Sequence, residues 1–578
     1  MQERKAVVTG AGIVCAAGCG LDEVSTSLEA GRSGLGPLTL FKSTRFGHVL
    51  VGQVTADIGR LTAGFRGSRS DRLAWIAANE ALARAGLLPG SRSDRDPRRF
   101  GVVTGGTVGG MGQSEGVVRT LLLEHKFRCG PFRFHECACS TMACARAAGA
   151  KGPCITLSSA CSASAMGIAA AAEMIVAGDA DRVLAGGCDS LSRLTLNGFG
   201  SLLLIDPAGN RPFDATRAGI ALGEGAAFVV LELEEAARAR GARVIAELSG
   251  WGLSCDAYHA TAPQPEGAGA AAAMRAALQR AGLQPSDISY INAHGTATRD
   301  NDLMEARALK LVFDGRPPPF SSTMRFFGHT LAASGAMKAV VCLDALERQR
   351  VHGNPGFDTV DPEIGLEPVR VCRPAAVDHV MSNSFGFGGN NASLVFSRPG
   401  AGRAKSDSGM SRGCGGVAVA SGRKLERLAV VGAGIVGPAG TGAAAFLEAC
   451  RGGHVATGVR EMPPCLPAAK VPAYVVGPFG AETVLAPGRR RKLARLQQMA
   501  LVAAREGLPP GLLASFKAER ACVAVGTGMG MLNEASSFVE NMIANNEHAP
   551  QPLCFTNSVH NALASQVAME LGLKGMNT

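Results

Sequence analysis

Short apolar segments alternate with Ala-rich helical patterns over residues 1–400. RVLAGGCD at 182–189 and AAFVVLELEEA at 226–236 each open on a compact run of Val, Leu and Ala, which is typical of a buried strand. AVVCLDALERQ at 339–349 has instead the apolar spacing of a helix packed on one face. Repeated alternation of this kind predicts a predominantly α/β architecture for this part of the chain.

Residues 399–425 interrupt the alternation. This segment is rich in Gly, Ser and basic residues and lacks apolar periodicity, so we expect a linker. Beyond it, three patterns of the first 111 residues return in the same order, which predicts an internal repeat. The matched pairs are 5–20 with 428–442, 70–87 with 490–508, and 100–111 with 522–531.

The repeat is partial. When Lys574 and Gly575 are aligned with Lys151 and Gly152, the second copy ends about six residues before the counterpart of Cys161. We therefore expect a C-terminal unit at 426–578 that has no nucleophile of its own. Half a fold leaves apolar surface uncovered, so this unit should be incompletely stable or belong to a longer chain.

Length and composition narrow the class of protein. At 578 residues, with 46% hydrophobic and 18% charged residues, the chain fits at least two globular units. The net charge is +10, but the basic residues are scattered among acids without interleaved aromatic residues, so we expect no nucleic-acid partner.

The odd count of 17 Cys and a start without a signal-peptide pattern favour the cytoplasm. The most apolar stretch, 160–178, carries Ser and Glu, so we expect a buried helix and no membrane span.

One segment has the pattern of a nucleophile elbow. In KGPCITLSSACSASAMGIAAAAEMIVAG an apolar strand at 154–158 turns at Ala160-Cys161 and leads into a long helix. A thiol at a helix N-terminus is expected to have a lowered pKa, because the helix dipole and free N–H groups stabilise the thiolate. A single Cys in such a place is more often a buried core residue than a nucleophile.

Two histidines stand in strand-to-turn contexts. His294 ends an apolar strand in YINAHGTATRDNDLMEA, and His329 precedes a small-residue helix in FSSTMRFFGHTLAASGAMKAV. Each His alone would be structural more often than not. Two His in such contexts together with the elbow Cys161 are much less easily explained by chance.

Two further motifs are less specific. The Gly-rich turn in MSNSFGFGGNNASLVF offers backbone N–H groups that could hold an oxyanion. The segment RPFDATRAGIALGEGAAFVV is interpreted as an ion-paired structural loop.

Together, the five motifs resemble the β-ketoacyl-acyl-carrier-protein synthases in order and over nearly all of 1–398. The resemblance implies a thiolase-like layered α/β/α/β/α fold that is internally duplicated, with halves at about 1–240 and 241–398. It implies a homodimer, an acyl carrier protein as partner, acyl and malonyl thioesters as substrates, and no cofactor, since phosphopantetheine arrives on the carrier. The C-terminal unit resembles the N-terminal half of the same family, as in a chain-length-factor-like subunit.

The resemblance also assigns roles to residues. It implies that Cys161 takes the acyl group and that His294 and His329 stabilise the enolate formed when malonyl carrier loses carbon dioxide. The remaining implied roles are an oxyanion hole from the N–H groups of Cys161 and Phe387, phosphopantetheine binding by Thr296 and Thr298, gating by Phe387, and structural support from Asp302 and Glu305.

Two positions depart from the family pattern. The family usually has Lys five residues before its second His and Glu nine residues after it, whereas this chain has Met324 and Lys338. Loss of the Lys alone would leave a buried acid unpaired. We hypothesise that Lys338 supplies the positive charge from across the site; the alternative is that the ion pair is dispensable.

Other interpretations remain open at this point. Gly432, Gly434 and Gly437 fit a dinucleotide-binding pattern, but no strand ending in Asp or Glu follows at the required distance. Cys137, Cys139 and Cys144 beside His135 lack the spacing of a common zinc site, so we expect no metal. A Cys-His hydrolase or amidotransferase and a catalytically impaired carrier-binding scaffold are the rival functions.

Overall fold

The protein is described here from a computed structural model. The structure describes residues 4–88, 90, 96–401, 428–453, 457–461, 470–549 and 551–578. Most of the predicted linker, from residue 402 onward, lies outside the described residues.

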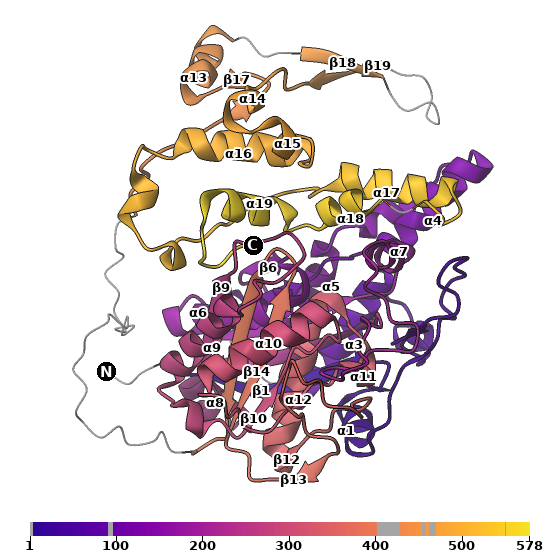
Figure 1. Cartoon of the computed structure of the whole chain (residues 1–578), viewed down its shortest axis with the longest axis vertical. Coiled ribbons are helices and arrows are strands. Elements are labelled where there is room, and N and C mark those ends of the chain that lie inside the picture. The colour runs from indigo at the N-terminus through magenta and orange to yellow at the C-terminus, as the bar shows by residue number, and fades with distance from the viewer. Residues whose placement is uncertain are drawn as a thin grey trace.

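One mixed sheet of eleven strands organises the first unit, residues 1–398 (Figure 1). From β1 outward its order is β1-β8-β7-β5-β6, and from the adjacent β9 outward it is β9-β15-β14-β10-β11. Each half thus builds the same five-strand pattern, which is the internal duplication expected of this fold. The strands of the two halves are Ala6–Cys15 (β1), Phe100–Gly105 (β5), Cys154–Leu157 (β6), Arg182–Asp189 (β7), Gly225–Leu233 (β8), Ala246–Cys255 (β9), Tyr290–Asn292 (β10), Phe320–Ser321 (β11), His379–Gly386 (β14) and Asn390–Ser397 (β15).

Helices form three layers around the strands. Two central helices pack between the strands of the two halves, and one outer pair of helices covers each half. The arrangement is the predicted α/β/α/β/α layering. The central helices are Ala163–Ala177 (α6) and Ser334–Arg348 (α12), and the outer pairs are Arg69–Arg84 (α3) with Ala138–Ala148 (α5) and Ala268–Ala281 (α9) with Arg299–Val312 (α10).

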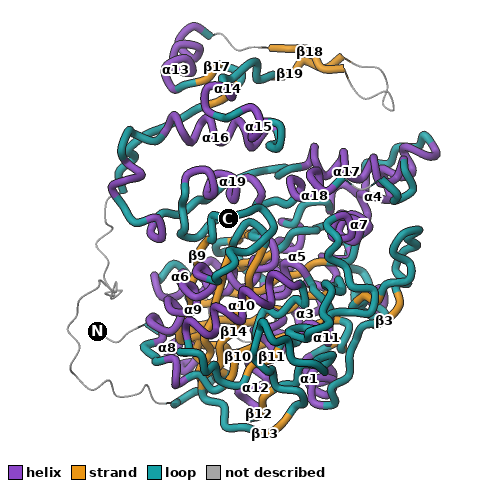
Figure 2. The backbone as a smooth tube through the Cα atoms, viewed as in Figure 1, coloured by secondary structure: helices purple, strands orange, loops and turns teal. Residues whose placement is uncertain are grey.

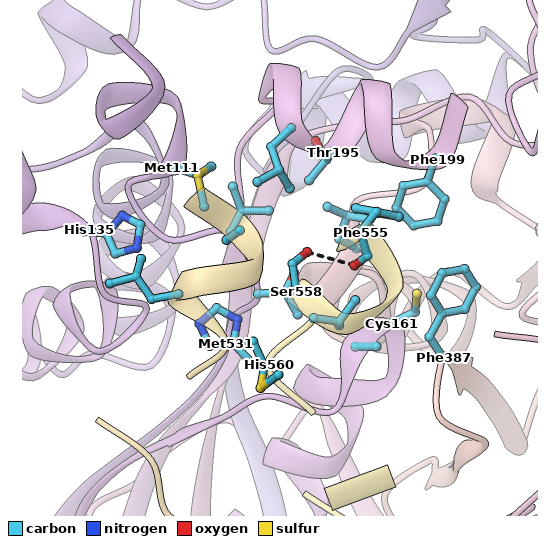
Figure 3. Close-up of a pocket in the computed structure, with 18 of the residues that line it drawn as sticks. Met111, His135, Cys161, Thr195, Phe199, Phe387, Met531, Phe555, Ser558 and His560 are labelled. Carbon is cyan, nitrogen blue, oxygen red and sulfur yellow. Dashed lines mark hydrogen bonds between the residues drawn. The ribbon is translucent and has the colours of Figure 1, made fainter. Parts of the chain in front are cut away.

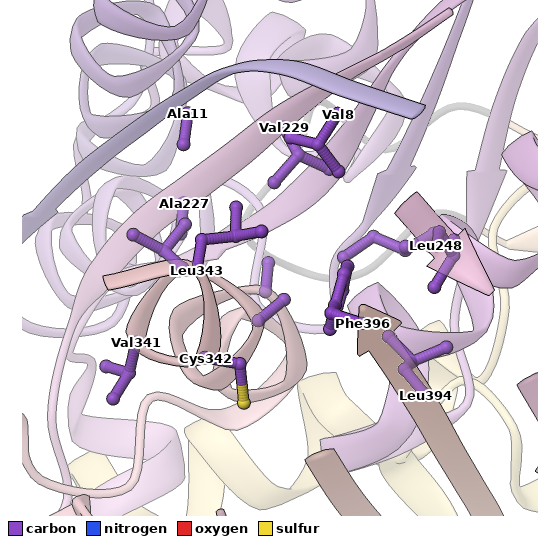
Figure 4. Packing of buried hydrophobic residues seen from close by; sticks show 14 of the residues in the cluster. Val8, Ala11, Ala227, Val229, Leu248, Val341, Cys342, Leu343, Leu394 and Phe396 are labelled. Atoms are coloured by element: carbon purple, nitrogen blue, oxygen red, sulfur yellow. The ribbon is translucent and has the colours of Figure 1, made fainter. Parts of the chain in front are cut away.

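The largest buried apolar cluster lies in the central layer. Figure 4 shows Val341 and Leu343 of α12 beside Val229 of β8 and Phe396 of β15, so one helix contacts strands of both halves. Ala160–Ala177 is the one described helical stretch long and apolar enough to cross a membrane, and most of it is buried inside the protein. The predicted buried helix is therefore confirmed as part of this core.

The C-terminal unit, residues 426–578, lies along one end of the first unit (Figures 1 and 2). Its last helices contact Met111–Glu124 (α4) and Arg193–Ser201 (α7) of the first unit. The elements of the C-terminal unit are Val436–Gly437 (β16), Gly440–Thr441 (β17), Ala443–Gly452 (α13), Thr457–Glu461 (β18), Lys470–Tyr474 (β19), Ala481–Val484 (α14), Pro487–Arg490 (α15), Arg495–Gly507 (α16), Leu532–Ala544 (α17), Pro552–Ser558 (α18) and Ala562–Leu571 (α19).

Both units use the same carboxylate contact to join strand and helix. In the first unit Glu80 accepts hydrogen bonds from the backbone N–H groups of Ile13 at 2.9 Å and Leu21 at 2.8 Å. In the C-terminal unit Glu506 accepts from Ile435 at 2.9 Å and Ala443 at 2.7 Å. The similarity predicted from sequence order thus recurs in side-chain contacts.

Some glycines of the dinucleotide-like pattern serve this packing. A Cβ at Gly434 would lie 1.8 Å from the carbonyl oxygen of Ala503, and a Cβ at Gly12 would lie 2.2 Å from that of Ala77. Gly12 and Gly434 therefore let a helix approach the neighbouring chain segment closely, which gives these two glycines a structural reason without a nucleotide. Gly437 has open space where its Cβ would lie.

Apolar side chains are exposed on the C-terminal unit. Leu428 is 97% exposed and Val430 91% exposed, although the matching segment of the first unit, β1, is buried throughout. In the first unit that segment pairs with β8 and β9. Exposed apolar side chains agree with the prediction of half a fold, which itself stays a prediction.

Candidate active site

Cys161 lies at a strained turn between strand and helix. After β6 the chain forms a short 3₁₀ turn at Ala160–Ser162 and continues as α6, and Ala160 has φ of +50°. A residue with Cβ adopts this left-handed conformation at a cost of about 1 kcal/mol or more, so the surrounding structure must impose it. The predicted elbow is present.

The expected low pKa of Cys161 is wrong for this structure. Burial raises the pKa of the Cys161 thiol to about 12. The backbone N–H groups of Phe387 and Cys161 and the charge of Lys338 act in the opposite direction but do not outweigh it. Sequence reasoning counted the helix N-terminus and could not weigh the loss of water around the sulfur.

The two histidines lie close together and are held as neutral rings. Their ring centroids are 5.7 Å apart at 90°. Burial, together with the charge of Lys338, lowers the pKa of His294 well below its usual value and that of His329 to about 3.

Hydrogen bonds select the tautomer of each ring. Nδ1 of His294 faces Nζ of Lys338 at 3.2 Å, and Nδ1 of His329 accepts from the backbone N–H of Leu331 at 3.1 Å. Since Nδ1 is the acceptor in both cases, Nε2 carries the proton in both. Each ring thus has one N–H left to donate.

Lys338 lies beside His294, inside α12. Its ammonium is fully buried and donates to the backbone carbonyl of Asn383 as well as to His294. Met324, where the family usually has Lys, is also buried, and its sulfur is 3.9 Å from the hydroxyl of Ser334. A cation therefore contacts His294 although the family's usual lysine is missing.

Two acids brace the loop that follows His294. Glu305 accepts from the N–H groups of His294 and Gly295, both at 2.8 Å. Asp302 accepts from Phe213 N–H at 2.7 Å and Ala297 N–H at 3.1 Å. These contacts agree with the structural role that the resemblance implies for both acids.

Two cavities meet at Cys161. The larger has a volume of about 610 Å³. Its lining contains every residue assigned to the triad and to phosphopantetheine binding, which are Cys161, His294, Thr296, Thr298, His329 and Phe387. The smaller has a volume of about 70 Å³, is mostly apolar, and shares Cys161, Phe199 and Phe387 with the first.

The C-terminal unit forms one wall of the smaller cavity. Figure 3 shows Met531, Phe555 and His560 facing the pocket that Cys161 and Phe199 line from the first unit. The rings of Phe199 and Phe555 are in edge contact, with centroids 5.3 Å apart. These residues could not be predicted from the sequence. A repeated pattern indicates that a fold is copied, but it does not show which surface the copy packs against.

Asp189 is a second feature that sequence analysis missed. Its buried carboxylate accepts from Thr107 and Val108, which line the smaller cavity, and from the N–H of Ala332 at 2.9 Å, three residues after His329. Burial raises the pKa of Asp189 to about 6. An acid at the end of the apolar strand RVLAGGCD was the signal that could have identified it.

The remaining candidate motifs have structural roles. The predicted ion-paired loop is confirmed, with Arg217 2.5 Å from Asp361 and Arg69 2.5 Å from Glu224. Cys137 and Cys144 are buried and Cys139 is half-buried. Within the described residues, no group of three or more His, Cys, Asp or Glu side chains could hold a metal ion.

Family models match most of the chain. The model of the β-ketoacyl synthase N-terminal domain matches residues 3–237 and also 425–578, and that of the C-terminal domain matches 245–358. Nodulation protein E of Rhizobium meliloti is 37% identical over 68% of this chain and 99% of its own length. A 3-oxoacyl-[acyl-carrier-protein] synthase 2 of Synechocystis is 35% identical over 69% of this chain and 99% of its own.

Solved structures give the same grouping. The ishigamide ketosynthase/chain length factor is 32% identical, with a TM-score of 0.66 over 69% of this chain and 100% of that one. A ketosynthase solved with a type II polyketide acyl carrier protein is 28% identical, with a TM-score of 0.62 over 69% of this chain and 100% of that one.

Proposed function

Because the chain belongs to the β-ketoacyl synthase family, we propose that its first unit condenses an acyl group held on Cys161 with malonyl-acyl carrier protein. The observation that carries the proposal is the pair of neutral histidines, each with Nε2–H free to donate, in one cavity with a buried thiol. The product is a 3-oxoacyl thioester for fatty acid or polyketide-type biosynthesis.

The first half-reaction loads the enzyme. The sulfur of Cys161 attacks the thioester carbonyl of the acyl carrier, the carrier thiol leaves, and the proton of Cys161 ends on that thiol. The backbone N–H groups of Cys161 and Phe387 stabilise the oxyanion of this step. The lowering effect that both N–H groups have on the pKa of the Cys161 thiol supports this role.

The second half-reaction forms the carbon–carbon bond. Malonyl carrier loses carbon dioxide, and its thioester oxygen becomes an enolate oxygen that accepts from Nε2–H of His294 and His329. The enolate carbon attacks acyl-Cys161, and the thiolate of Cys161 leaves. A neutral donor suits this step because it stabilises the developing charge without giving up its proton.

The contacts of the histidines weigh against the rival hydrolase. A Cys-His hydrolase orients its base with a carboxylate or an amide side chain. Here Nδ1 of His294 faces Lys338, and Nδ1 of His329 accepts from the backbone. The position of Lys338 also favours an active enzyme over an impaired scaffold.

The proposal extends to partners and location. The carrier is proposed as partner because a similar ketosynthase was solved with its acyl carrier protein. Thr296 and Thr298 line the larger cavity, where they would meet a phosphopantetheine arm, so no resident cofactor is needed.

The described cysteines are free thiols, which suits a reducing cytoplasm. A homodimer remains part of the proposal, and light scattering would test it.

We also propose that the C-terminal unit is a partial copy of the N-terminal half. The match of the N-terminal family model to 425–578 and the shared Glu80 and Glu506 contacts support this origin. The proposed chemistry belongs to the first unit, where Cys161, His294 and His329 line one cavity.

Mass spectrometry after incubation with acyl carrier tests the function. The parent protein should gain one acyl group on Cys161 and then release a 3-oxoacyl carrier when malonyl carrier is added. Cys161→Ala should show neither event, whereas Cys144→Ala, which removes a buried thiol outside both cavities, should show both. Acylation followed only by release of free acid would identify a hydrolase and refute the proposal.

A further inference from the structure

The C-terminal unit touches the predicted oxyanion turn directly. The side-chain N–H₂ of Asn561 donates to the carbonyl oxygen of Phe387 at 2.8 Å, and Asn561 is only 3% exposed. The approach is close, since a Cβ at Gly388 would lie 2.9 Å from Nδ2 of Asn561 and 2.0 Å from Oγ of Ser565. A residue 174 positions away along the chain therefore holds the Phe387 carbonyl.

Hydrogen bonds within the first unit hold the two glycines of this turn, from Gly388 N–H to the Ala260 carbonyl and from Asp256 N–H to the Gly389 carbonyl, both at 2.8 Å, so Asn561 acts on the Phe387 carbonyl rather than on the whole turn. Gly388 and Gly389 follow Phe387 with φ of +83° and +77°, so two consecutive residues lack side chains that could pack. Within the first unit, the Phe387 carbonyl has a second donor in Nδ2 of Asn390, at the longer distance of 3.3 Å. Asn561 thus provides the shorter of the two hydrogen bonds to this carbonyl.

The ring of Phe387 is linked to the same unit. Its centroid lies 5.4 Å from that of Phe199, and Phe199 lies 5.3 Å from Phe555 of α18. The Phe387 carbonyl is therefore held by Asn561, and its ring is linked to Phe555 through Phe199. Its backbone N–H acts to lower the pKa of the Cys161 thiol.

We propose that Asn561 is a positioning residue of the condensing site, which holds Phe387 by its carbonyl so that the N–H of Phe387 points at Cys161. The inference rests on the proposed function for the role of that N–H. Asn561 touches neither substrate nor sulfur and acts only through Phe387. The C-terminal unit thereby contributes to catalysis without a nucleophile.

The substitution Asn561→Ser isolates this contact. Asn561 precedes α19 but its side chain makes no capping hydrogen bond, so replacing it by Ser, a favourable N-cap residue, should leave the stability of the helix unchanged. The Ser hydroxyl is too short to reach the Phe387 carbonyl. We expect the rate of acyl transfer to Cys161 to fall roughly tenfold, less than the 10²–10³-fold that loss of an oxyanion donor costs.

Asn557→Ser is the matched control. Asn557 is as well buried, but its hydrogen bonds go to Lys492 and Gln497 within the C-terminal unit. This variant should acylate at the parent rate. Equal rates for parent and Asn561→Ser, or equal losses in both variants, would overturn the proposal.

Alkylation of Cys161 by iodoacetamide gives a readout that needs no carrier. The Phe387 N–H favours the thiolate, so Asn561→Ser should move the pH dependence of alkylation to higher pH, as followed on the Cys161 peptide by mass spectrometry. Asn557→Ser should leave it in place. If the parent never becomes acylated, the proposed function fails, and this pH shift still decides the role of Asn561.

Discussion

The cation beside His294 comes from position 338 rather than from position 324. The family pattern puts Lys at position 324 and an acid at 338, whereas here Met324 is buried and Lys338 bonds to His294. Burial lowers the pKa of Lys338, and the charge of Glu305 opposes that shift. The buried acid that braces the His294 loop thus has a cation nearby, which reduces the cost of burying both charges.

Lys338→Met should slow decarboxylation of malonyl carrier by about tenfold or more, because it removes the donor to Nδ1 of His294 and leaves Glu305 without a nearby cation. Release of carbon dioxide in single-turnover assays measures the effect. A variant as fast as the parent would mean that the ion pair is dispensable.

The double variant Met324→Lys with Lys338→Glu is the control for that experiment. It restores the arrangement usual in the family, so it should decarboxylate faster than Lys338→Met. A double variant as slow as the single one would show that the two positions are not interchangeable here.

Protonation of His294 or His329 should not change the rate of decarboxylation between pH 7 and pH 5. Both pKa values are depressed, so the neutral donor form persists as the pH falls and is lost only near pH 3 for His329. The assay uses Cys161→Ala, which removes thiol ionisation. Lys338 and Glu305 also face His294, and burial raises the pKa of Glu305 to about 7. An inflection near pH 6.5 that persists in Glu305→Gln would contradict the assignment.

At the scale of elements, the helices α17 to α19 connect the two units. Phe538 and Met542 of α17 and Phe555 of α18 pack in one cluster with Leu194 and Phe199 of α7. The same cluster encloses the smaller, mostly apolar cavity beside Cys161. We propose that this cavity holds the acyl chain, so that side chains from both units limit its length.

Phe555→Ala should widen the smaller cavity and shift acyl selectivity toward longer chains. The lost ring lines the cavity and lies against Phe199 and Gly198. Acylation rates of Cys161 with carriers of graded acyl length measure the shift, and short chains should lose at most a few-fold. Phe538→Ala is the control, since Phe538 packs in the same cluster but does not line the cavity.

For the whole molecule, the sequence allowed prediction of whatever is repeated or periodic. Alternating apolar segments predicted the α/β layers, which the structure has. The order of three motifs predicted a partial copy at the C-terminus, which stays a prediction. The motifs around Cys161, His294 and His329 predicted a shared cavity, where all three lie. These features depend on local pattern and on order along the chain.

The features that sequence analysis missed depend on distance in space. The pKa of Cys161 follows from burial that no local motif encodes, and the contact of Asn561 with Phe387 joins two units whose packing the repeat does not specify. The sequence predicted that Lys338 supplies a positive charge from across the site, but not that its ammonium would contact His294. Contacts between distant segments decide the chemistry that the motifs make possible.

The wall of the acyl cavity belongs to the same chain as the nucleophile. A wall supplied by a separate subunit is lost on dilution, whereas a tethered wall keeps a high effective concentration at any protein level. Synthesis of one chain also delivers nucleophile and wall in a fixed one-to-one ratio. On this proposal, the acyl length that the protein accepts depends on one gene product rather than on the supply of a second.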